Sequence, residues 1–148
     1  MEKLKALVEL RKRCGVPFVI NARTDAFRFC PGDTEAKLAE AVRRSNVYKA
    51  LGVDCVYPMG LVESAHIGKF VEEVQFPMNV MVRKGLPPVA ELQKLGVARM
   101  SFGPAASYAT FGFLKRAAKE VMEKGTFESL VEGAINFDEL NALAVPRK

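Results

Sequence analysis

The chain has 148 residues, of which 49% are hydrophobic and 26% are charged, and its formal net charge is +5. This is the composition of a globular domain, and no apolar run approaches the ~20 residues that a membrane-spanning helix needs. The basic residues are scattered and no aromatic residues alternate with them, so we expect no binding to nucleic acid or membranes. Cys14, Cys30 and Cys55 match no metal-binding or redox spacing, and we expect reduced thiols in a cytoplasmic protein.

Amphipathic helices alternate with short apolar strands along the chain. In chain order we predict a helix over 1–15, a strand from residue 18, a helix over 34–50, a strand after residue 52, a helix over 63–74, a strand over 76–82, a helix over 87–96, a strand after residue 96, a helix over 107–125, and short helices over 126–133 and 136–144. Gly15, Gly52 and Gly96 each end a helix just before a strand, where glycine adopts the left-handed conformation at little cost.

This alternation predicts an α/β fold with parallel strands and right-handed crossovers. Two architectures fit the four strand–helix units: half of a (β/α)₈ TIM barrel, or a small doubly wound sheet. A complete (β/α)₈ barrel usually needs ~250 residues, and this chain supplies about half of that. We expect a partial barrel over residues 1–125 and a C-terminal helical tail over 126–148.

The stretch FVINARTDAF, residues 18–27, places polar side chains on one side of a strand. Phe18, Val19 and Ile20 indicate a buried strand, and successive side chains of a strand point to opposite faces. Asn21, Arg23 and Asp25 therefore share the face of Val19, and the other face carries Phe18, Ile20, Ala22 and Thr24.

At this stretch the chain resembles the isocitrate lyase/phosphoenolpyruvate mutase superfamily. The resemblance continues through EAVRRSNVYKALGVDCVYPMG, PMNVMV, ELQKLGVARMSFGP and KEVMEKGTF, and it covers about residues 4–127. It implies a (β/α)₈ barrel, here its second half, and an enzyme that makes or breaks C–C or P–C bonds in small 2-oxo and 2-hydroxy acids with the help of Mg²⁺. The polar face would then point into the barrel toward its C-terminal mouth, where active sites lie.

The resemblance assigns a catalytic role to Arg23. It matches the superfamily arginine that binds the substrate carboxylate, and a guanidinium can grip a carboxylate through two parallel hydrogen bonds. Fixed positive charge also lowers the energy of a developing enolate. Asn21 and Asp25 would support Arg23. The alternative is an Arg23–Asp25 ion pair that only closes the barrel mouth.

Three further residues are candidates for substrate binding. Asn79 lies in a strand where related lyases have a substrate-binding asparagine, and the alternative is a hydrogen bond at the strand end. Ser101 and Gly103 end the last strand before a helix, where an anion can bind, and the alternative is a plain turn. Met59 replaces a glutamate of related lyases, and Pro58 and Gly60 flank it at the same mouth.

The resemblance also implies residues that this sequence lacks. The superfamily's Mg²⁺ ligands are aspartates of the first half of the barrel, as are the lysine and cysteine of its gating loop, and none of them occurs here. His66 is the single histidine and is expected to be exposed or half-buried on a helix. Because no second histidine or cysteine stands at ligand spacing from it, we expect no zinc site. We therefore expect a partial active site in a truncated, split or excerpted chain.

The favoured function is lyase or mutase chemistry through an enolate, with a small carboxylate as substrate. The alternatives are a non-catalytic half-barrel that serves assembly or anion binding, and a self-contained flavodoxin-like fold. We also expect a homo-oligomer, or association with a missing N-terminal half, because an open half-barrel would expose some of the apolar strand residues Val19, Val53, Cys55, Val80, Val82 and Met100.

Overall fold

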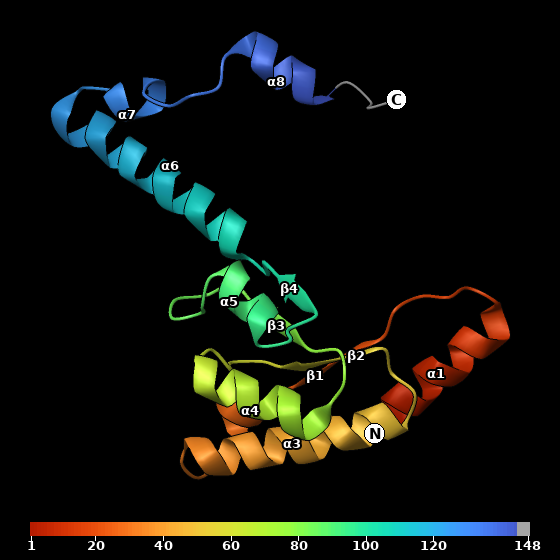
Figure 1. Ribbon diagram of the computed structural model, residues 1–148. Helices are drawn as coiled ribbons and strands as arrows, with labels where there is room; N and C mark the ends of the chain where they lie inside the picture. The colour runs from red at the N-terminus through yellow and green to blue at the C-terminus, as the bar shows by residue number, and fades with distance from the viewer. Residues whose placement is uncertain (145–148) are drawn as a thin grey trace. The chain divides into compact units, whose positions relative to one another are not determined.

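Strands and helices alternate in the computed structural model, which describes residues 1–144 (Figure 1). The elements are α1 (Glu2–Cys14), β1 (Asn21–Thr24), α2 (Ala26–Phe29), α3 (Thr34–Ala50), β2 (Cys55–Pro58), α4 (Ser64–Val74), β3 (Asn79–Met81), α5 (Val89–Lys94), β4 (Arg99–Ser101), α6 (Ala105–Lys124), α7 (Glu128–Val131) and α8 (Phe137–Ala144). The chain divides into two units, Met1–Gly103 and Pro104–Lys148. Residues 145–148 of the predicted tail lie outside the described residues.

The four strands of the first unit are parallel and follow one another in chain order. β1 pairs with β2, and β3 pairs with β4. A parallel bridge between Val56 and Met78 joins the two pairs, supported by a 2.9 Å hydrogen bond from the Val56 N–H to the Pro77 carbonyl. The predicted parallel strand–helix units are thus confirmed.

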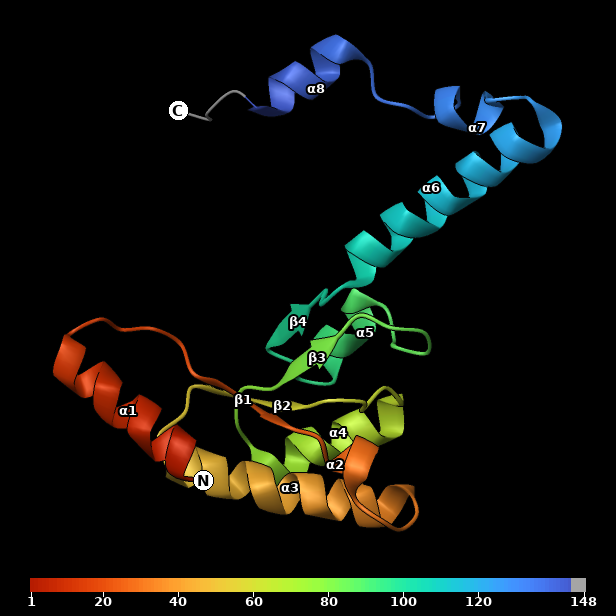
Figure 2. The ribbon, with the colours of Figure 1, turned by 180° about the vertical axis from the view of Figure 1, so that it is seen from behind.

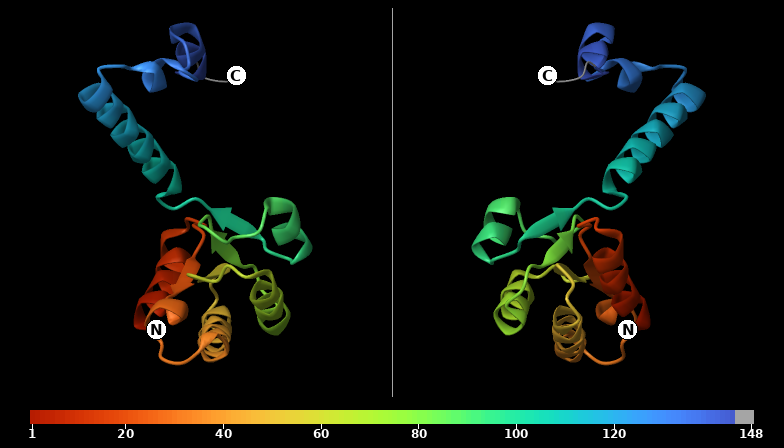
Figure 3. Two further views of the ribbon diagram at one scale, coloured as in Figure 1. Left: turned by 90° about the vertical axis from the view of Figure 1, so that its left-hand side faces the viewer. Right: turned by 90° about the vertical axis from the view of Figure 1, so that its right-hand side faces the viewer.

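The helices of this unit pack against one face of the strands. α3 runs along β1 and β2 (Figure 2), and Figure 3 shows α3, α4 and α5 on the same side of the strands. Alternate residues in the strands or directly before them are buried on this side, namely Ile20, Ala22, Val56, Met78 and Val80. Helices on a single face are typical of a barrel wall, whereas a doubly wound sheet has helices on both faces.

Two local features fix the helices at the positions that the sequence indicates. Asp33 caps α3 by accepting a 2.9 Å hydrogen bond from the Ala36 N–H. Arg11 anchors α1 through an ion pair with Asp54 and a 2.8 Å hydrogen bond to the Gly52 carbonyl. Asp54 also accepts a hydrogen bond from the Ile20 N–H, and that bond, followed by Arg11, lowers the pKa of its carboxyl group.

The prediction for the first strand was partly wrong. β1 begins at Asn21 rather than at Phe18, and the side chain of Val19 is 71% exposed instead of buried. The expected alternation itself is confirmed, because Ala22 and Thr24 are buried whereas Arg23 is exposed. Val19 shares the face of Arg23, which no helix covers, and this explains its exposure.

Two of the six apolar strand residues named above, Val19 and Cys55, lie on the uncovered face, because Val19 has the parity of Arg23 and Cys55 lies in register with Asn21. Val53, Cys55 and Val80 are buried, and Val80 lies in register with Met100 on the helix-covered side. Among these six apolar strand residues, only Val19 is strongly exposed to solvent. The uncovered face therefore carries the apolar residues Val19, Cys55 and Met81 beside the polar residues of the same parity.

The second unit consists of α6, α7 and α8, in agreement with the helices expected there. Glu120 of α6 holds the start of α7 by accepting hydrogen bonds from the Thr126 hydroxyl at 2.7 Å and the Glu128 N–H at 3.0 Å, together with the Ser129 hydroxyl. Among its described residues, Ala117 is the one buried apolar side chain. No helix within residues 1–144 is long and apolar enough to cross a membrane.

Candidate functional site

One row of side chains runs across all four strands on the face that the helices leave uncovered. Arg23 lies in register with Tyr57, and Asn79 lies in register with Arg99. The bridge between residues 56 and 78 brings the next residue of each strand, Tyr57 and Asn79, to the same level. The row therefore reads guanidinium, phenol, amide, guanidinium.

Arg23 stands at one end of this row and is held by Asp25. Its Nε and Nη2 atoms both donate to Asp25 Oδ1, at 2.9 and 2.6 Å. Its Nη1 amino group has no hydrogen-bond partner among residues 1–144. The expected ion pair is present, and it leaves the outer edge of the guanidinium, Nη1 with the second Nη2 hydrogen, open to a carboxylate.

Tyr57 lies beside Arg23, with the guanidinium carbon 6.0 Å from the ring centroid. Its hydroxyl is buried and has no hydrogen-bond partner in the described part of the chain. Burial raises the pKa of Tyr57, whereas the positive charges of Arg23 and Arg83 act against that rise. The phenol is therefore a neutral donor whose hydrogen-bonding capacity is unfilled within residues 1–144.

Asn79 is fully buried and ties β3 to β4. Its Nδ2 donates to Ser101 Oγ at 3.1 Å, and its Oδ1 accepts from Arg99 Nη1 at 2.7 Å. Ser101 in turn donates to the Val80 carbonyl at 3.2 Å. These bonds engage both ends of the Asn79 amide across the strands, a structural role related to the strand-end hydrogen bond named above as the alternative.

Gly103 follows β4 with φ of +52°, and a Cβ atom there would lie 2.5 Å from Met81 Sδ. The close approach of Met81 therefore accounts for the glycine. Asn21 lies at the start of β1, and its Oδ1 is buried without a partner among residues 1–144. Of the six predicted residues, hydrogen bonds join Arg23 with Asp25 and Asn79 with Ser101, whereas Asn21 and Gly103 belong to neither pair.

Three residues of this region were not predicted from the sequence: Tyr57, Arg99 and Arg83. The first two sit at alternate positions of their strands, as Arg23 does, and that parity is visible in CVYP and RMS. The register that joins them is a long-range property which no local pattern carries. Arg83 lies after β3, in a loop that has no periodicity to read.

Within residues 1–144, no cluster of metal-ligating side chains offers Mg²⁺ a ready site. Mg²⁺ is held by carboxylates together with waters and substrate oxygens. Asp25 already accepts two hydrogen bonds from Arg23, and no group of three or more His, Cys, Asp or Glu side chains within residues 1–144 could hold a metal ion. His66 is half-buried on α4, with Nε2 3.1 Å from Glu35 Oε1 and Nδ1 2.8 Å from Glu63 Oε2.

Comparisons with known proteins agree with this architecture. A putative lyase/mutase from Burkholderia cenocepacia J2315 superposes with a TM-score of 0.87 at 29% identity, over 98% of this chain and 52% of that chain. A putative phosphonomutase from the same organism gives a TM-score of 0.71 at 34% identity, over 79% of this chain and 48% of that one. For 2,3-dimethylmalate lyase the TM-score is 0.73 at 20% identity, over 95% and 48%, which shows the shared fold.

This chain spans about half the length of these solved structures, and the fold is half of their TIM barrel. No protein with a curated description matches it. The family model of phosphoenolpyruvate phosphomutase matches residues 1–122, which is most of the chain. The chain therefore belongs to the phosphoenolpyruvate phosphomutase family, within the PEP mutase/isocitrate lyase superfamily.

Proposed function

We propose that the chain forms the carboxylate-binding side of an enzyme that makes or breaks C–C or P–C bonds in small 2-oxo or 2-hydroxy acids. The observation that supports this proposal is the Nη1/Nη2 edge of the Arg23 guanidinium, which Asp25 leaves free. Asp25 fixes the guanidinium from one side, so a substrate carboxylate can be gripped by Nη1 and Nη2 without reorganisation of the arginine. Arg23 would be the catalytic residue, because its charge also stabilises the enolate that develops beside it.

Tyr57 extends this site, because its unpartnered hydroxyl lies on the same face as Arg23. A neutral phenol next to a fixed cation can donate a hydrogen bond to an enolate oxygen. Asn21 and Asp25 would position Arg23. Asn79, Ser101 and Gly103 would shape the far side of the site through the bonds between β3 and β4.

The test is the change Arg23→Lys, assayed in any form of this protein that turns over a 2-oxo or 2-hydroxy acid. Lysine keeps the charge but cannot offer two parallel N–H groups. We expect kcat/KM to fall on the order of 10²–10³-fold, the usual loss for one transition-state contact. The control is Arg13→Lys on the exposed end of α1. If the Arg23→Lys variant kept more than half of the wild-type kcat/KM, the role of Arg23 would be refuted.

A second candidate function is a non-catalytic half-barrel that binds small anions or serves assembly. The observation that favours it is that no cluster of three or more metal-ligating side chains lies within the described residues. Binding and turnover distinguish the two functions. Saturable pyruvate binding that depends on Arg23, without turnover in any assembled form, would favour the binding module.

A further inference from the structure

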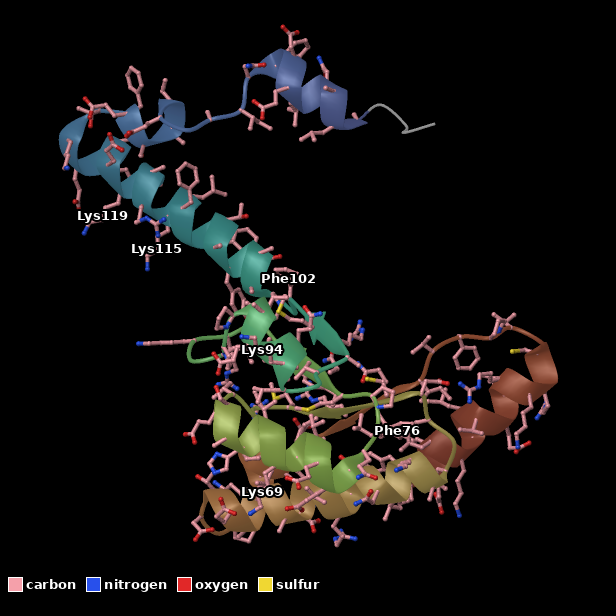
Figure 4. All side chains as sticks on the ribbon, in the orientation of Figure 1. Lys69, Phe76, Lys94, Phe102, Lys115 and Lys119 are labelled. Carbon is pink, nitrogen blue, oxygen red and sulfur yellow. The ribbon has the colours of Figure 1, made fainter. Side chains whose placement is uncertain are left out.

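His66 lies between two carboxylates at the start of α4, on the side of α4 that meets α3. Its Nε2 atom lies 3.1 Å from Glu35 Oε1 of α3, and its Nδ1 atom lies 2.8 Å from Oε2 of Glu63, directly before α4. Lys69, about one turn further along α4, donates a 2.7 Å hydrogen bond to Glu35 Oε2 (Lys69 is labelled in Figure 4). These four side chains, which we call the α3–α4 clasp, connect the helices that follow β1 and β2.

The imidazole ring of His66 is 18% exposed, and its charged neighbours are few. In the described part of the chain, ion pairs join the ring to Glu35 and Glu63, and Lys69 shares Glu35 with it. The helix α5 approaches the start of α4 through Glu91, which accepts a hydrogen bond from the Ser64 hydroxyl. The neighbours of the ring from α2, from the start of α3 and from the loop after β2 are uncharged apart from Glu63, and they line a small cleft with it: Phe27, Thr34, Gly60, Leu61 and Val62.

The two carboxylates suit a protonated ring better than a neutral one. A carboxylate only accepts hydrogen bonds, and a neutral imidazole carries one N–H group, so it turns a lone pair toward one of the two carboxylates. The imidazolium ion carries an N–H group on both nitrogens. The contact of the buried Nδ1 atom with Glu63 is not aligned as a hydrogen bond, so its attraction depends on the charge of the ring. Lys69, and after it His66, lower the pKa of Glu35, so Glu35 stays ionised while histidine titrates.

We infer that the α3–α4 clasp is a pH-dependent connection, which holds the starts of α3 and α4 together when His66 is protonated and loosens when His66 is neutral. Two carboxylates and one ammonium group leave the clasp with one negative charge, which the imidazolium ion neutralises. The folded chain therefore holds this proton more tightly than the unfolded chain does. The stabilisation is present at low pH and is lost as the pH rises past the range in which histidine gives up its proton, around 6.5. This inference does not depend on the proposed role of Arg23.

The test is amide hydrogen exchange of the full chain, measured by mass spectrometry for residues 61–70 between about pH 5.5 and about pH 8. The exchange rate of the variant His66→Gln is divided by that of the wild type at each pH, which cancels the intrinsic effect of pH on exchange. We expect this ratio to be about two- to fivefold larger at the lowest pH than at the highest. The effect is that of an exposed ion pair, because the side chains of Glu35 and Glu63 are 59% and 68% exposed.

The NMR signal of the imidazole ring identifies the titrating group, because His66 is the single histidine of the sequence. We expect the change in exchange to have the same midpoint as this signal. Glu35→Gln should remove most of the pH dependence, whereas the control Glu72→Gln, at an exposed carboxylate of α4, should preserve it. An exchange ratio that does not vary with pH, a midpoint that differs from that of the ring, or equal effects of the two glutamate changes would overturn the inference. If circular dichroism shows that His66→Gln does not fold, Glu35→Gln replaces it in the exchange ratio and decides in the same way.

Discussion

Asn79 is fully buried, and both ends of its amide are bonded across the strands. Replacing it with alanine would leave the Ser101 hydroxyl and the Arg99 guanidinium without these partners. We therefore expect Asn79→Ala to lower the free energy of unfolding by about 1–3 kcal/mol, the cost of losing such bonds in a buried place. Urea denaturation measures the change.

The control for this substitution is Asn46→Ala, because Asn46 is exposed on α3 and makes no side-chain hydrogen bond within residues 1–144. It should change stability by less than about 0.5 kcal/mol. If Asn79→Ala left stability unchanged but abolished substrate binding, Asn79 would be a substrate contact and the cross-strand interpretation would be wrong.

The sequence predicted single residues well where the information was local. The two-residue spacing of Arg23 and Asp25 placed both on one face, and the structure joins them by two hydrogen bonds. The local pattern did not indicate that Tyr57 and Arg99 complete the row. Their place depends on the register between strands that are about 20 to 35 residues apart in the sequence, as the strand pairs show.

Glu120 acts at the scale of helices, because it connects α6 to the start of α7. Hydrogen bonds from Ser129, from Thr126 and from the backbone lower its pKa from 4.5 to about 2. A carboxyl group whose pKa is lower in the folded chain than in the unfolded chain stabilises the fold at pH values above the pKa of the unfolded chain. This contribution is therefore complete above about pH 4.5 and is lost as the pH falls toward 2.

Ser129→Ala tests this connection, since the Ser129 hydroxyl is the largest cause of the lowered pKa. We expect the Glu120 carboxyl group, followed by carbon-13 NMR, to titrate closer to 4.5 in the variant than in the wild type. The helicity of residues 128–131 should fall at a higher pH as well. An unchanged titration curve would show that, in solution, the Ser129 hydroxyl does not donate a hydrogen bond to the Glu120 carboxylate.

Element bounds were predictable where the sequence supplies its own end signals. α3 runs from Thr34 to Ala50 as expected, because Asp33 caps its start and Gly52, with φ of +88°, follows its end. α2 was not predicted, since four residues show no helical period. β1 starts later than expected because its pairing with β2 begins at Asn21, opposite Cys55, and local sequence does not specify where two strands begin to pair.

At the scale of the whole molecule, the described residues offer Mg²⁺ no cluster of ligating side chains, and this predicts that the isolated chain is inactive. We expect the purified 148-residue chain to show no EDTA-sensitive turnover of oxaloacetate, methylisocitrate or phosphonopyruvate. The reason is that Asp25 is engaged by Arg23 and no cluster of three metal-ligating side chains exists in the described residues. Turnover that EDTA abolishes in this chain would contradict the prediction.

Both units present surfaces that a closed barrel or an oligomer would cover. Within residues 1–144, β1 pairs only with β2 and β4 pairs only with β3, so each has one unpaired edge. In the second unit Met122 is 87% exposed and Phe137 is 76% exposed. Unpaired strand edges recruit other strands, and exposed apolar patches recruit other surfaces.

We therefore expect the isolated chain not to persist as a well-packed monomer. It should self-associate, aggregate, or bind a second barrel half when one is supplied, because each of these removes exposed apolar surface from water. Sedimentation equilibrium at micromolar concentration should show species heavier than the 16.3 kDa monomer. Met122→Glu should weaken association, whereas Lys119→Glu, on the same helix (Figure 4), should weaken it less, because lysine contributes little apolar area. A sharp monomer that unfolds cooperatively and binds no hydrophobic dye would show that the half-barrel is stable alone, and that the exposed residues of α6 and α8 need no partner.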